Sequence, residues 1–334
     1  MEKIQLAHGS GGKLSQDLFI NVFQKKFSNQ YLNEAHDGAV LDLQGRRIAF
    51  STDSFVVSPL FFPGGNIGDL AINGTVNDLS MCGAKPVYLS AGFIIEEGLE
   101  MGRLIEIVES MQQAALKAEI LIVTGDTKVV EHGSGDGVYI NTAGVGLVER
   151  DITISPKNAA DGDLIIINGS IADHGIAIMS KREGLEFETE IKTDSAPLNH
   201  MIDGVLDVSE NIHVLRDPTR GGIAATLNEI AESSNHGIVL QEEMIPISDQ
   251  VKAVSSILGL DPLYIANEGK VLVIVKECDA MKVLAKMKSY PEGEDAAVIG
   301  KVISNHPGRV IMETKIGTKR VVDMPVGNQL PRIC

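Results

Sequence analysis

The stretch MGRLIEIVESMQQAALKAEILIVTGDTK, residues 101–128, indicates the fold class. Its apolar side chains first recur at helical spacing, which predicts an amphipathic helix over residues 101–117. The apolar run at residues 120–124 then predicts a strand, which leads directly into Asp126 and Lys128. Because ligands of α/β folds gather where strands end, this stretch predicts a fold of helices on a sheet, with a binding site near Asp126.

Helical and strand-like patterns also alternate through the rest of the chain. A segment rich in turn-forming residues, 151–163, interrupts them and predicts a linker. We therefore expect two α+β domains, residues 1–150 and 151–320, and a mobile tail, residues 321–334, whose prolines and glycine disfavour regular structure. The other predicted elements are helices near residues 14–23, 67–82, 171–181, 222–233 and 280–287, and strands at 47–52, 87–95, 138–148, 164–167, 213–215, 271–275, 298–303 and 309–312.

The composition argues against several classes of protein. The formal net charge of −16 disfavours an extended nucleic-acid surface, which needs excess Lys and Arg. No apolar run reaches the roughly 18 residues of a membrane span, and residues 1–5 lack the apolar core of a signal peptide. Three cysteines without a C-x-x-C motif argue against a disulfide or zinc framework. We expect a cytoplasmic protein that binds neither nucleic acid nor membranes.

Four aspartates are candidates for a metal site because they follow predicted strands or lie beside small and polar residues. They are Asp37, Asp53, Asp78 and Asp126. Converging carboxylates repel one another unless they hold a hard cation such as Mg²⁺, which binds oxygen ligands and bridges to phosphate. The group therefore predicts a magnesium and phosphate site. The alternative is that each aspartate only caps a helix or a turn.

Three further features are candidates for binding phosphate. Gly9-Ser10-Gly11-Gly12-Lys13 could wrap it with backbone N–H groups and a lysine, but P-loop spacing is absent and a flexible turn is equally consistent. Lys128, beside Asp126, is a better-placed cation unless it is an ordinary exposed lysine. The loop Arg216-Asp217-Pro218-Thr219-Arg220-Gly221-Gly222 joins a strand to a helix, an arrangement that binds anions at the start of the helix.

The predicted helix 67–82 carries Asp69, Asn73 and Asn77 on one face, at helical spacing. With Asp78 at its edge, this face either lines a site or is a solvated stripe. Glu268, in the segment Asn267-Glu268-Gly269-Lys270 before a strand, is a candidate base or metal ligand, or only a turn residue.

The chain ends on Cys334, after Pro331-Arg332-Ile333. We expect a cysteine at this position to be exposed and mobile. An exposed thiol in a cytoplasmic protein is a nucleophile or an acceptor if another protein uses it. The alternative is a cysteine placed there by chance.

Taken in order, these segments resemble the HypE family of hydrogenase maturation factors. The motifs are AHGSGGK, STDS, FFPGGNIGDLAINGTVNDL, VTGDTKVV, INTAG, RDPTRGG, ANEGK and the terminal PRIC. The resemblance runs from residue 5 to the last residue, and PRIC, FFPGGNIG and TGDTK are its most specific motifs. The wider group is the aminoimidazole-ribotide-synthetase-like (PurM-like) superfamily of ATP-binding enzymes. The resemblance implies a two-domain α+β fold of this type, with a homodimer formed through the sheets of the N-terminal domain.

The resemblance also implies an activity, that of an ATP-dependent carbamoyl dehydratase. A carbamoyltransferase, HypF, would place a carboxamide on the sulfur of Cys334. The protein would then dehydrate this group with ATP to an S-cyanide (a thiocyanate), releasing ADP and phosphate. The cyanide would pass to iron on a HypC–HypD complex, on the way to the [NiFe] hydrogenase centre.

The matching motifs imply roles for individual residues. The Gly9–Lys13 loop and Lys128 would hold the triphosphate, and the four aspartates would hold Mg²⁺ and nucleotide, together with Asn77 and Asn141. Glu268 would act as the base or polarise the carboxamide, in a pocket shaped by Arg216, Asp217 and Arg220. The residues assigned to catalysis are Cys334, Glu268, Lys128 and Asp78.

Two alternatives to this function stay open. One is another ATP-dependent synthetase of the superfamily, although the Gly9–Lys13 loop lacks the reactive cysteine that the resemblance to selenophosphate synthetase would require. The other is a non-catalytic carrier of cyanide or metal on Cys334. The acidic loops argue against a carrier, and a single soft thiol without a His or Cys neighbour is a poor metal site.

Overall fold

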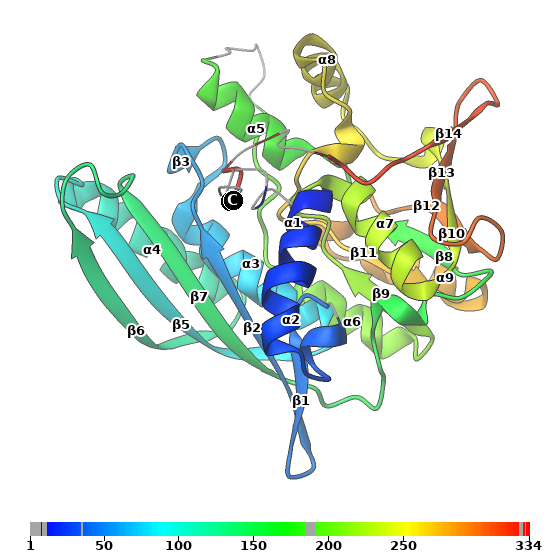
Figure 1. The fold of residues 1–334 in the computed structure, drawn as a ribbon, viewed down its shortest axis with the longest axis horizontal. Helices are drawn as coiled ribbons and strands as arrows, with labels where there is room; N and C mark the ends of the chain where they lie inside the picture. The colour runs from blue at the N-terminus through cyan, green and yellow to red at the C-terminus, as the bar shows by residue number, and fades with distance from the viewer. Residues whose placement is uncertain (1–7, 9–11, 35, 185–190, 327–329, 331) are drawn as a thin grey trace.

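The computed structural model of the chain describes residues 8, 12–34, 36–184, 191–326, 330 and 332–334 (Figure 1). It shows two α+β units, each built on one main sheet, on either side of the predicted linker. Among the described residues, no helix has the length and apolar character needed to cross a membrane.

The first unit is a five-stranded sheet in the order β1-β2-β7-β5-β6. β5 pairs antiparallel with β7 and parallel with β6, which forms one edge of the sheet. Helices α3 and α4 cover one face of this sheet (Figure 1). The elements are β1 Ala39–Leu43, β2 Arg46–Phe55, α3 Ile67–Met81, β5 Lys85–Glu96, α4 Met101–Lys117, β6 Leu121–Val130 and β7 Val138–Leu147, with a small hairpin of β3 Phe61–Phe62 and β4 Gly65–Asn66.

Helix α3 is buried on nearly all sides because it lies between the first sheet and the second unit. Only Asp69 and Asp78 of its 15 residues are not buried. Asp69 belongs to a capping box: Asn66 accepts from the backbone of the first turn, and the Asp69 carboxylate accepts from the Asn66 N–H at 2.6 Å. This box fixes where α3 begins and therefore which of its residues reach the second unit.

The second unit is a seven-stranded mixed sheet in the order β14-β13-β10-β12-β8-β11-β9. Its central strands β8 and β11 are uniformly apolar, as expected of strands covered on both faces. The strands are β8 Leu164–Ile167, β9 Ile212–Arg216, β10 Gly237–Gln241, β11 Leu272–Val275, β12 Ala297–Ile303, β13 Val310–Glu313 and β14 Lys319–Val321. The helices are α5 Asp173–Arg182, α6 Asn199–Val208, α7 Gly222–Ser234, α8 Asp249–Leu258 and α9 Glu277–Met287.

The described N-terminal residues form a separate helical segment near α7 (Figure 1). It starts as α1 Gly12–Leu18, continues as a π-helix, η2 Phe19–Gln24, and ends in α2 Lys25–Phe27. Single turns of 3₁₀-helix complete the structure at η3 Leu32–Glu34, η4 Pro156–Asn158, η5 Glu242–Met244, η6 Pro262–Tyr264 and η7 Pro291–Gly293.

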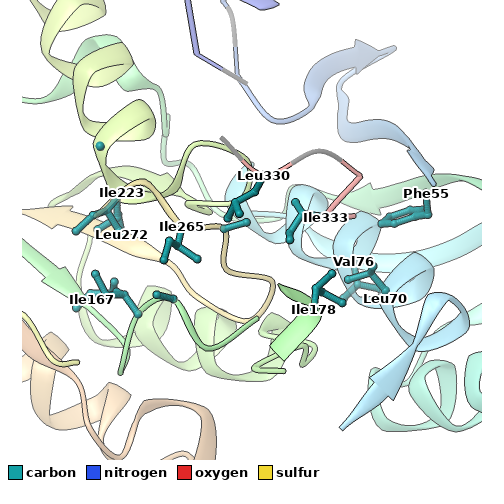
Figure 2. Close-up of a cluster of buried hydrophobic side chains, with 14 of the residues drawn as sticks. Phe55, Leu70, Val76, Ile167, Ile178, Ile223, Ile265, Leu272, Leu330 and Ile333 are labelled. Atoms are coloured by element: carbon teal, nitrogen blue, oxygen red, sulfur yellow. The ribbon is translucent and has the colours of Figure 1, made fainter. Parts of the chain in front are cut away.

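The C-terminal end of the chain packs into the protein instead of extending into solvent. Leu330 and Ile333 are buried and join the apolar cluster that contains Val76 of α3 and Ile265 of the second unit (Figure 2). The Cys334 carbonyl accepts from the Val56 N–H at 3.1 Å. The expectation that the end of the tail is exposed is therefore wrong for this docked arrangement, because the apolar side chains gain more by burial than the terminus gains by freedom.

Candidate active site

A cavity of about 430 Å³ lies between the two units, where the C-terminus docks. Side chains from both units and from the N-terminal helix line it. They are His8, Ser15, Asp37, Thr52, Asp53, Gly74, Asp78, Arg216, Asp217, Thr219, Arg220, Thr226, Glu229, Glu268 and Cys334. The cavity therefore brings one terminal thiol together with five carboxylates of the predicted site and the two arginines of the predicted loop.

The packing of β2 against α3 positions two of the carboxylates. Asp53 lies on β2, and the Asn141 amide on the neighbouring strand β7 donates to the Asp53 carbonyl at 2.8 Å. Asp78 lies on α3 and accepts from the Ser51 hydroxyl at 2.6 Å. The helix approaches the strand closely because Gly74 faces Phe55, where a Cβ would come within 2.8 Å of the ring. Both carboxylates therefore line the same cavity, and the close packing of β2 against α3 holds them in place.

Asp37 and Arg216 form an ion pair that joins the two units. Arg216 Nε lies 2.6 Å from Asp37 Oδ1, and Arg216 Nη2 lies 2.9 Å from Glu229 Oε2 on α7. Burial alone would raise the pKa of Asp37, but the Arg216 guanidinium and the contact with His36 outweigh burial and lower it. Asp37 therefore stays charged in the cavity because it has a direct cationic partner at hydrogen-bond distance.

Three aspartates of the cavity, Asp53, Asp78 and Asp217, have pKa values raised above the ordinary value and hold protons more tightly than usual. Burial, followed by repulsion from Asp37, raises the pKa of Asp217 to about 8. Burial and the neighbouring Asp217, Asp53 and Asp37 raise the pKa of Asp78 well above its ordinary value. The cavity therefore carries more potential negative charge than its arginines neutralise, which favours a cationic ligand or bound protons.

Glu268 is held by its backbone, and its carboxyl group is left available. Its N–H donates to Asp194 Oδ1 at 3.0 Å, and its carbonyl accepts from Asn77 Nδ2 at 3.2 Å. The side chain is 4% exposed, and Oε1 has no hydrogen-bond partner among the described residues. Burial, with repulsion from Asp53 and other acids, raises its pKa well above the ordinary value. A buried carboxyl of this kind has the character of a general acid or base.

Cys334 and Arg220 interact electrostatically in the cavity. Burial raises the pKa of the Cys334 thiol, and the carboxylates of Glu268 and Asp53 raise it further, against the opposing effect of Arg220. The electrostatic influence of Cys334 is in turn the largest of the effects that raise the pKa of Arg220. The docked thiol is therefore protonated and poorly nucleophilic at neutral pH.

The loop after β9 places its charged residues through two glycines in the left-handed region. Gly221 has φ +81° and Gly222 has φ +62°. A Cβ on Gly222 would come within 2.5 Å of the Leu263 carbonyl oxygen. Only glycines allow this sharp turn into α7, which keeps Asp217 and Arg220 at the cavity.

The structure brings together eight of the predicted site residues at this cavity. They are Asp37, Asp53, Asp78, Arg216, Asp217, Arg220, Glu268 and Cys334. Asn141 does not line the cavity, but its amide donates to the Asp53 carbonyl, as described above. Asn77 is buried and binds backbone groups of the second unit, its amide donating to the Ala196 carbonyl at 3.0 Å. Asn73 and Asn77 on the polar face of α3 are therefore neither solvated nor part of the cavity lining, because they contact the second unit, whereas Asp78 at the edge of this face does line the cavity.

Asp126 and Lys128 lie outside the cavity of this chain. They pair with each other at 2.6 Å on β6, and their side chains are 70% and 68% exposed. Of the glycine-rich loop, Gly9, Ser10 and Gly11 lie outside the described residues. Gly12 is buried at φ +75°, and the Lys13 N–H donates to the Pro325 carbonyl at 3.1 Å, but neither residue lines the cavity.

Sequence reasoning assigned no role to seven residues that line the cavity. They are His8, Ser15, Thr52, Gly74, Thr219, Thr226 and Glu229. Thr226 and Glu229 lie three positions apart on one face of α7, a spacing that the sequence does show. Among the described residues, no group of three or more His, Cys, Asp or Glu side chains is arranged to hold a metal ion.

Two domain families match the chain over most of its length. The N-terminal domain of AIR synthase related protein matches residues 35–148, and the C-terminal domain matches residues 160–313. The chain is 51% identical over 333 residues to the carbamoyl dehydratase HypE of Cupriavidus necator, covering 99% of this chain and 95% of the relative. The chain belongs to the HypE family of AIR synthase related proteins. The identification rests on nearly the whole chain.

Two solved structures of the HypE family share the fold. One is the hydrogenase maturation protein HypE in complex with ATP, 49% identical, with a TM-score of 0.84 over 99% of this chain and 100% of that one. The other is a HypE–HypF complex, 49% identical, with a TM-score of 0.88 over 92% of this chain and 99% of that one. The PurM-like two-domain fold that the motifs predict is thereby confirmed.

Proposed function

We propose that this chain dehydrates an S-carboxamide on its own Cys334 to an S-cyanide, using ATP, in the maturation of [NiFe] hydrogenase. The observation that carries the proposal is the position of the chain end: Cys334 lines the same cavity as Glu268, the acidic residues and both arginines. A relative of the same family is named carbamoyl dehydratase, and another was solved with ATP. A passive carrier has no need for a cavity that encloses its thiol with a buried base.

The chemistry needs two steps at one carboxamide. In the first, the carboxamide oxygen attacks the γ-phosphorus of ATP, the bond to ADP breaks, and the nitrogen gives up one proton. In the second, a base takes the remaining N–H proton, the carbon–nitrogen triple bond forms, and the oxygen leaves with phosphate. Amide oxygen alone is a poor leaving group, so phosphorylation is what makes the second step possible.

Glu268 is the base that we propose for the second step, in which the remaining N–H proton is removed. Its carboxyl oxygen Oε1 is buried, without a partner among the described residues, and it lines the cavity with Cys334. Its raised pKa makes its carboxylate a stronger base than an ordinary glutamate. Arg220, which interacts electrostatically with both Cys334 and Glu268, is suited to stabilise negative charge on the carboxamide oxygen.

We propose that the other acidic residues bind Mg²⁺ and nucleotide. Asp53, Asp78 and Asp217 offer hard oxygen donors, and a divalent cation relieves the repulsion that raises the pKa of Asp78 and Asp217. When bound, Mg²⁺ supplies positive charge that neutralises the phosphates of ATP. Asp37 is a weaker candidate ligand because Arg216 already neutralises it.

The proposed reactions require Cys334 to occupy two positions. The docked thiol lies inside the cavity of its own chain, whereas a carbamoyltransferase must reach it from outside. A protonated Cys334 at the cavity is not a nucleophile for carbamoyl transfer. We propose that the chain end carrying Cys334 leaves the cavity to meet a carbamoyltransferase of the HypF type, which is found in complex with a HypE protein. The modified tail then returns for dehydration and leaves again to deliver cyanide to iron on a HypC–HypD complex. All of these partners would be met in the cytoplasm.

A homodimer through the first sheet is also part of the proposal. Apolar side chains of β5 and β6 are exposed on this chain, among them Tyr88, Ile94, Leu121, Val123 and Val129. A second copy would cover this apolar surface. Asp126 and Lys128 lie on β6, so we propose that they act on nucleotide only through this dimer.

The test is the intact mass of the chain after incubation with the carbamoyltransferase, carbamoyl phosphate and ATP, with Cys334→Ala as the control. We expect a carboxamide adduct on the native chain that loses the mass of one water when ATP is present, and no adduct on the variant. An adduct that never loses water would support the carrier alternative. No adduct would point to another synthetase of the superfamily.

A further inference from the structure

We propose that His174 is a positioning residue that couples the docking of the C-terminal tail to the placement of Glu268. The inference rests on the proposed function, because it concerns how the modified Cys334 and the base reach a fixed relative position. Its evidence is a set of contacts around the imidazole ring, none of which belongs to the cavity lining.

The His174 ring is wholly buried and contacts the tail directly. Nε2 lies 2.8 Å from the Ile333 carbonyl oxygen, and Nδ1 lies 2.7 Å from Thr193 Oγ1. A carbonyl oxygen can only accept, so Nε2 must carry the proton and donate it to Ile333. Nδ1 is then the acceptor, and the Thr193 hydroxyl donates to it. Thr193 thereby fixes the tautomer that binds the tail.

Other contacts hold the ring in this orientation. Phe62 packs edge-on against it, with the ring centroids 5.6 Å apart and the planes at 85°. The Ser195 N–H donates to Thr193 Oγ1 at 3.1 Å, which leaves the hydroxyl proton for the ring. Burial lowers the pKa of His174, so the ring is neutral, as this hydrogen-bond pattern requires. The ring is therefore a rigid donor aimed at one carbonyl of the tail.

The helix that carries His174 is fastened to the loop that carries Glu268. The Ala172 N–H donates to Asn267 Oδ1 at 2.7 Å, and the Gly175 N–H donates to the Ala266 carbonyl at 3.1 Å. Gly175 permits this approach, since a Cβ there would come within 2.3 Å of Ile265 Cγ2. The start of α5 and the residues just before Glu268 therefore move as one body.

A second connection runs through the segment that contains Thr193. The next residue, Asp194, accepts the Glu268 N–H at 3.0 Å and pairs with Lys270 at 3.0 Å, both side chains being almost fully buried. The same two-residue segment thus holds the His174 tautomer and the Glu268 backbone. A displaced tail removes the partner of Nε2, and both connections transmit that change to Glu268.

The first unit also binds the end of the tail through a hydrogen bond. The Val56 N–H, just after β2, donates to the Cys334 carbonyl, while His174 donates to the carbonyl of Ile333 one residue earlier. The last two carbonyl groups of the chain are therefore held by one hydrogen bond from each unit. This geometry fixes the Cys334 side chain between them, next to a base whose position depends on the same histidine.

The alternative is that His174 only packs in the core. Variants of similar shape distinguish this packing role from the proposed positioning role. His174→Gln can place an amide N–H at the reach of Nε2, whereas His174→Asn reaches only the position of Nδ1. Thr193→Val removes the hydroxyl that fixes the tautomer, and Thr193→Ser retains it. A Cys278→Ser background removes the exposed cysteine, so that alkylation reports Cys334 while Cys82 stays buried.

The first measurement is the rate at which iodoacetamide alkylates Cys334 in the unmodified chain, which requires no enzyme activity. We expect His174→Asn and Thr193→Val to react about fivefold to tenfold faster than the background protein, the effect of losing one buried hydrogen bond. His174→Gln and Thr193→Ser should react at the background rate. Equal rates for all five proteins, at equal melting temperatures, would overturn the role in docking.

The second measurement is the single-turnover loss of water from the carbamoylated chain with ATP, across pH. His174→Asn and Thr193→Val should slow this step and shift its pH profile, because Glu268 is misplaced, while the conservative variants retain both rate and profile. Unchanged profiles in the first pair would overturn the coupling to Glu268. If the background protein itself loses no water, the proposed function fails, and the alkylation rates still decide the role of His174 in docking.

Discussion

Arg216 Nε lies 2.6 Å from Asp37 Oδ1 across the boundary between the two units, and both side chains are almost excluded from solvent. Arg216 ends β9 of the second unit, while Asp37 precedes β1 of the first. Since Arg216 also binds Glu229, one guanidinium pairs with two carboxylates at the edge of the cavity. The pair therefore holds the units together and keeps Asp37 charged beside the other, partly protonated acids.

Replacing Arg216 by Met should destabilise the protein by about 3 kcal/mol or more, because it leaves buried carboxylates without a counter-charge. Chemical denaturation measures this free energy of unfolding. The double variant Arg216→Met with Asp37→Asn should recover part of the loss. As a matched control, Lys282→Met breaks a partly exposed pair with Asp279 and should cost less than about 1 kcal/mol. Equal losses of unfolding free energy in Arg216→Met and Lys282→Met would contradict the stabilising role of the buried pair between Arg216 and Asp37.

Asp217 should make the ligand-free protein less stable as pH rises. Its pKa is raised to about 8 in the fold by burial and by Asp37, whereas an unfolded chain gives about 3.9. The folded state thus keeps a proton that the unfolded state loses, and the stability from this carboxyl declines between about pH 4 and pH 8.

The variant Asp217→Asn removes this dependence. Its melting temperature should match that of the native chain near pH 4 and exceed it increasingly up to about pH 8. Asp249→Asn, at a fully exposed carboxylate, is the control and should show no such trend. A melting-temperature difference that is constant across pH would show that Asp217 does not hold its proton in the fold.

Glu268→Gln should slow the second chemical step, the loss of water, and leave the carbamoylation of Cys334 unchanged. The amide keeps the volume of the side chain and the backbone bonds to Asp194 and Asn77, but it cannot accept a proton. We expect water loss to slow about 10²- to 10⁴-fold. Mass spectrometry of the carbamoylated chain over time measures this, with the exposed Glu277→Gln as the control. Native rates in Glu268→Gln would assign the base elsewhere.

Asp126→Asn tests whether β6 serves the site of a second copy. The exposed pair with Lys128 contributes little to stability, so the melting temperature should stay unchanged. Water loss should nevertheless slow, and mixing this variant with Glu268→Gln should restore it, because one cavity of each mixed dimer then has both residues. Activity of the mixture no greater than that of the separate variants would reject the shared site.

The order of helices and strands along the chain was largely predictable from the sequence. The position of Asp126, within a strand at the edge of the first sheet, was not. The run at residues 120–124 does form a strand, but β6 continues to Val130, so Asp126 lies within the strand and not at its end. β6 also takes the edge of the sheet, beside β5. Neither the continuation of the strand nor its edge position follows from local apolar spacing, because both depend on which strands pair.

The polar face of α3 shows the same limit. Asn73 and Asn77 have the spacing of one helix face, which the sequence shows, but their partners are Ser195 and the backbone of Ala196 and Leu198. These residues are more than a hundred positions away, so spacing alone could not identify an inter-domain contact. By contrast, the glycines at the start of α7 and the aspartate and arginines beside them belong to one short loop. The structure places this aspartate and both arginines at the cavity, where the sequence pattern led us to expect a binding site.

The most direct test of the account follows the carboxamide oxygen. The tail is carbamoylated with a carboxamide that carries a heavy oxygen isotope, ATP is added, and the released phosphate and the solvent are analysed by mass spectrometry. If ATP activates the carboxamide of Cys334 by phosphorylation, the label will appear in inorganic phosphate, one atom for each cyanide formed. Label in water, or label retained on the chain while ATP is consumed, would contradict the proposed dehydration.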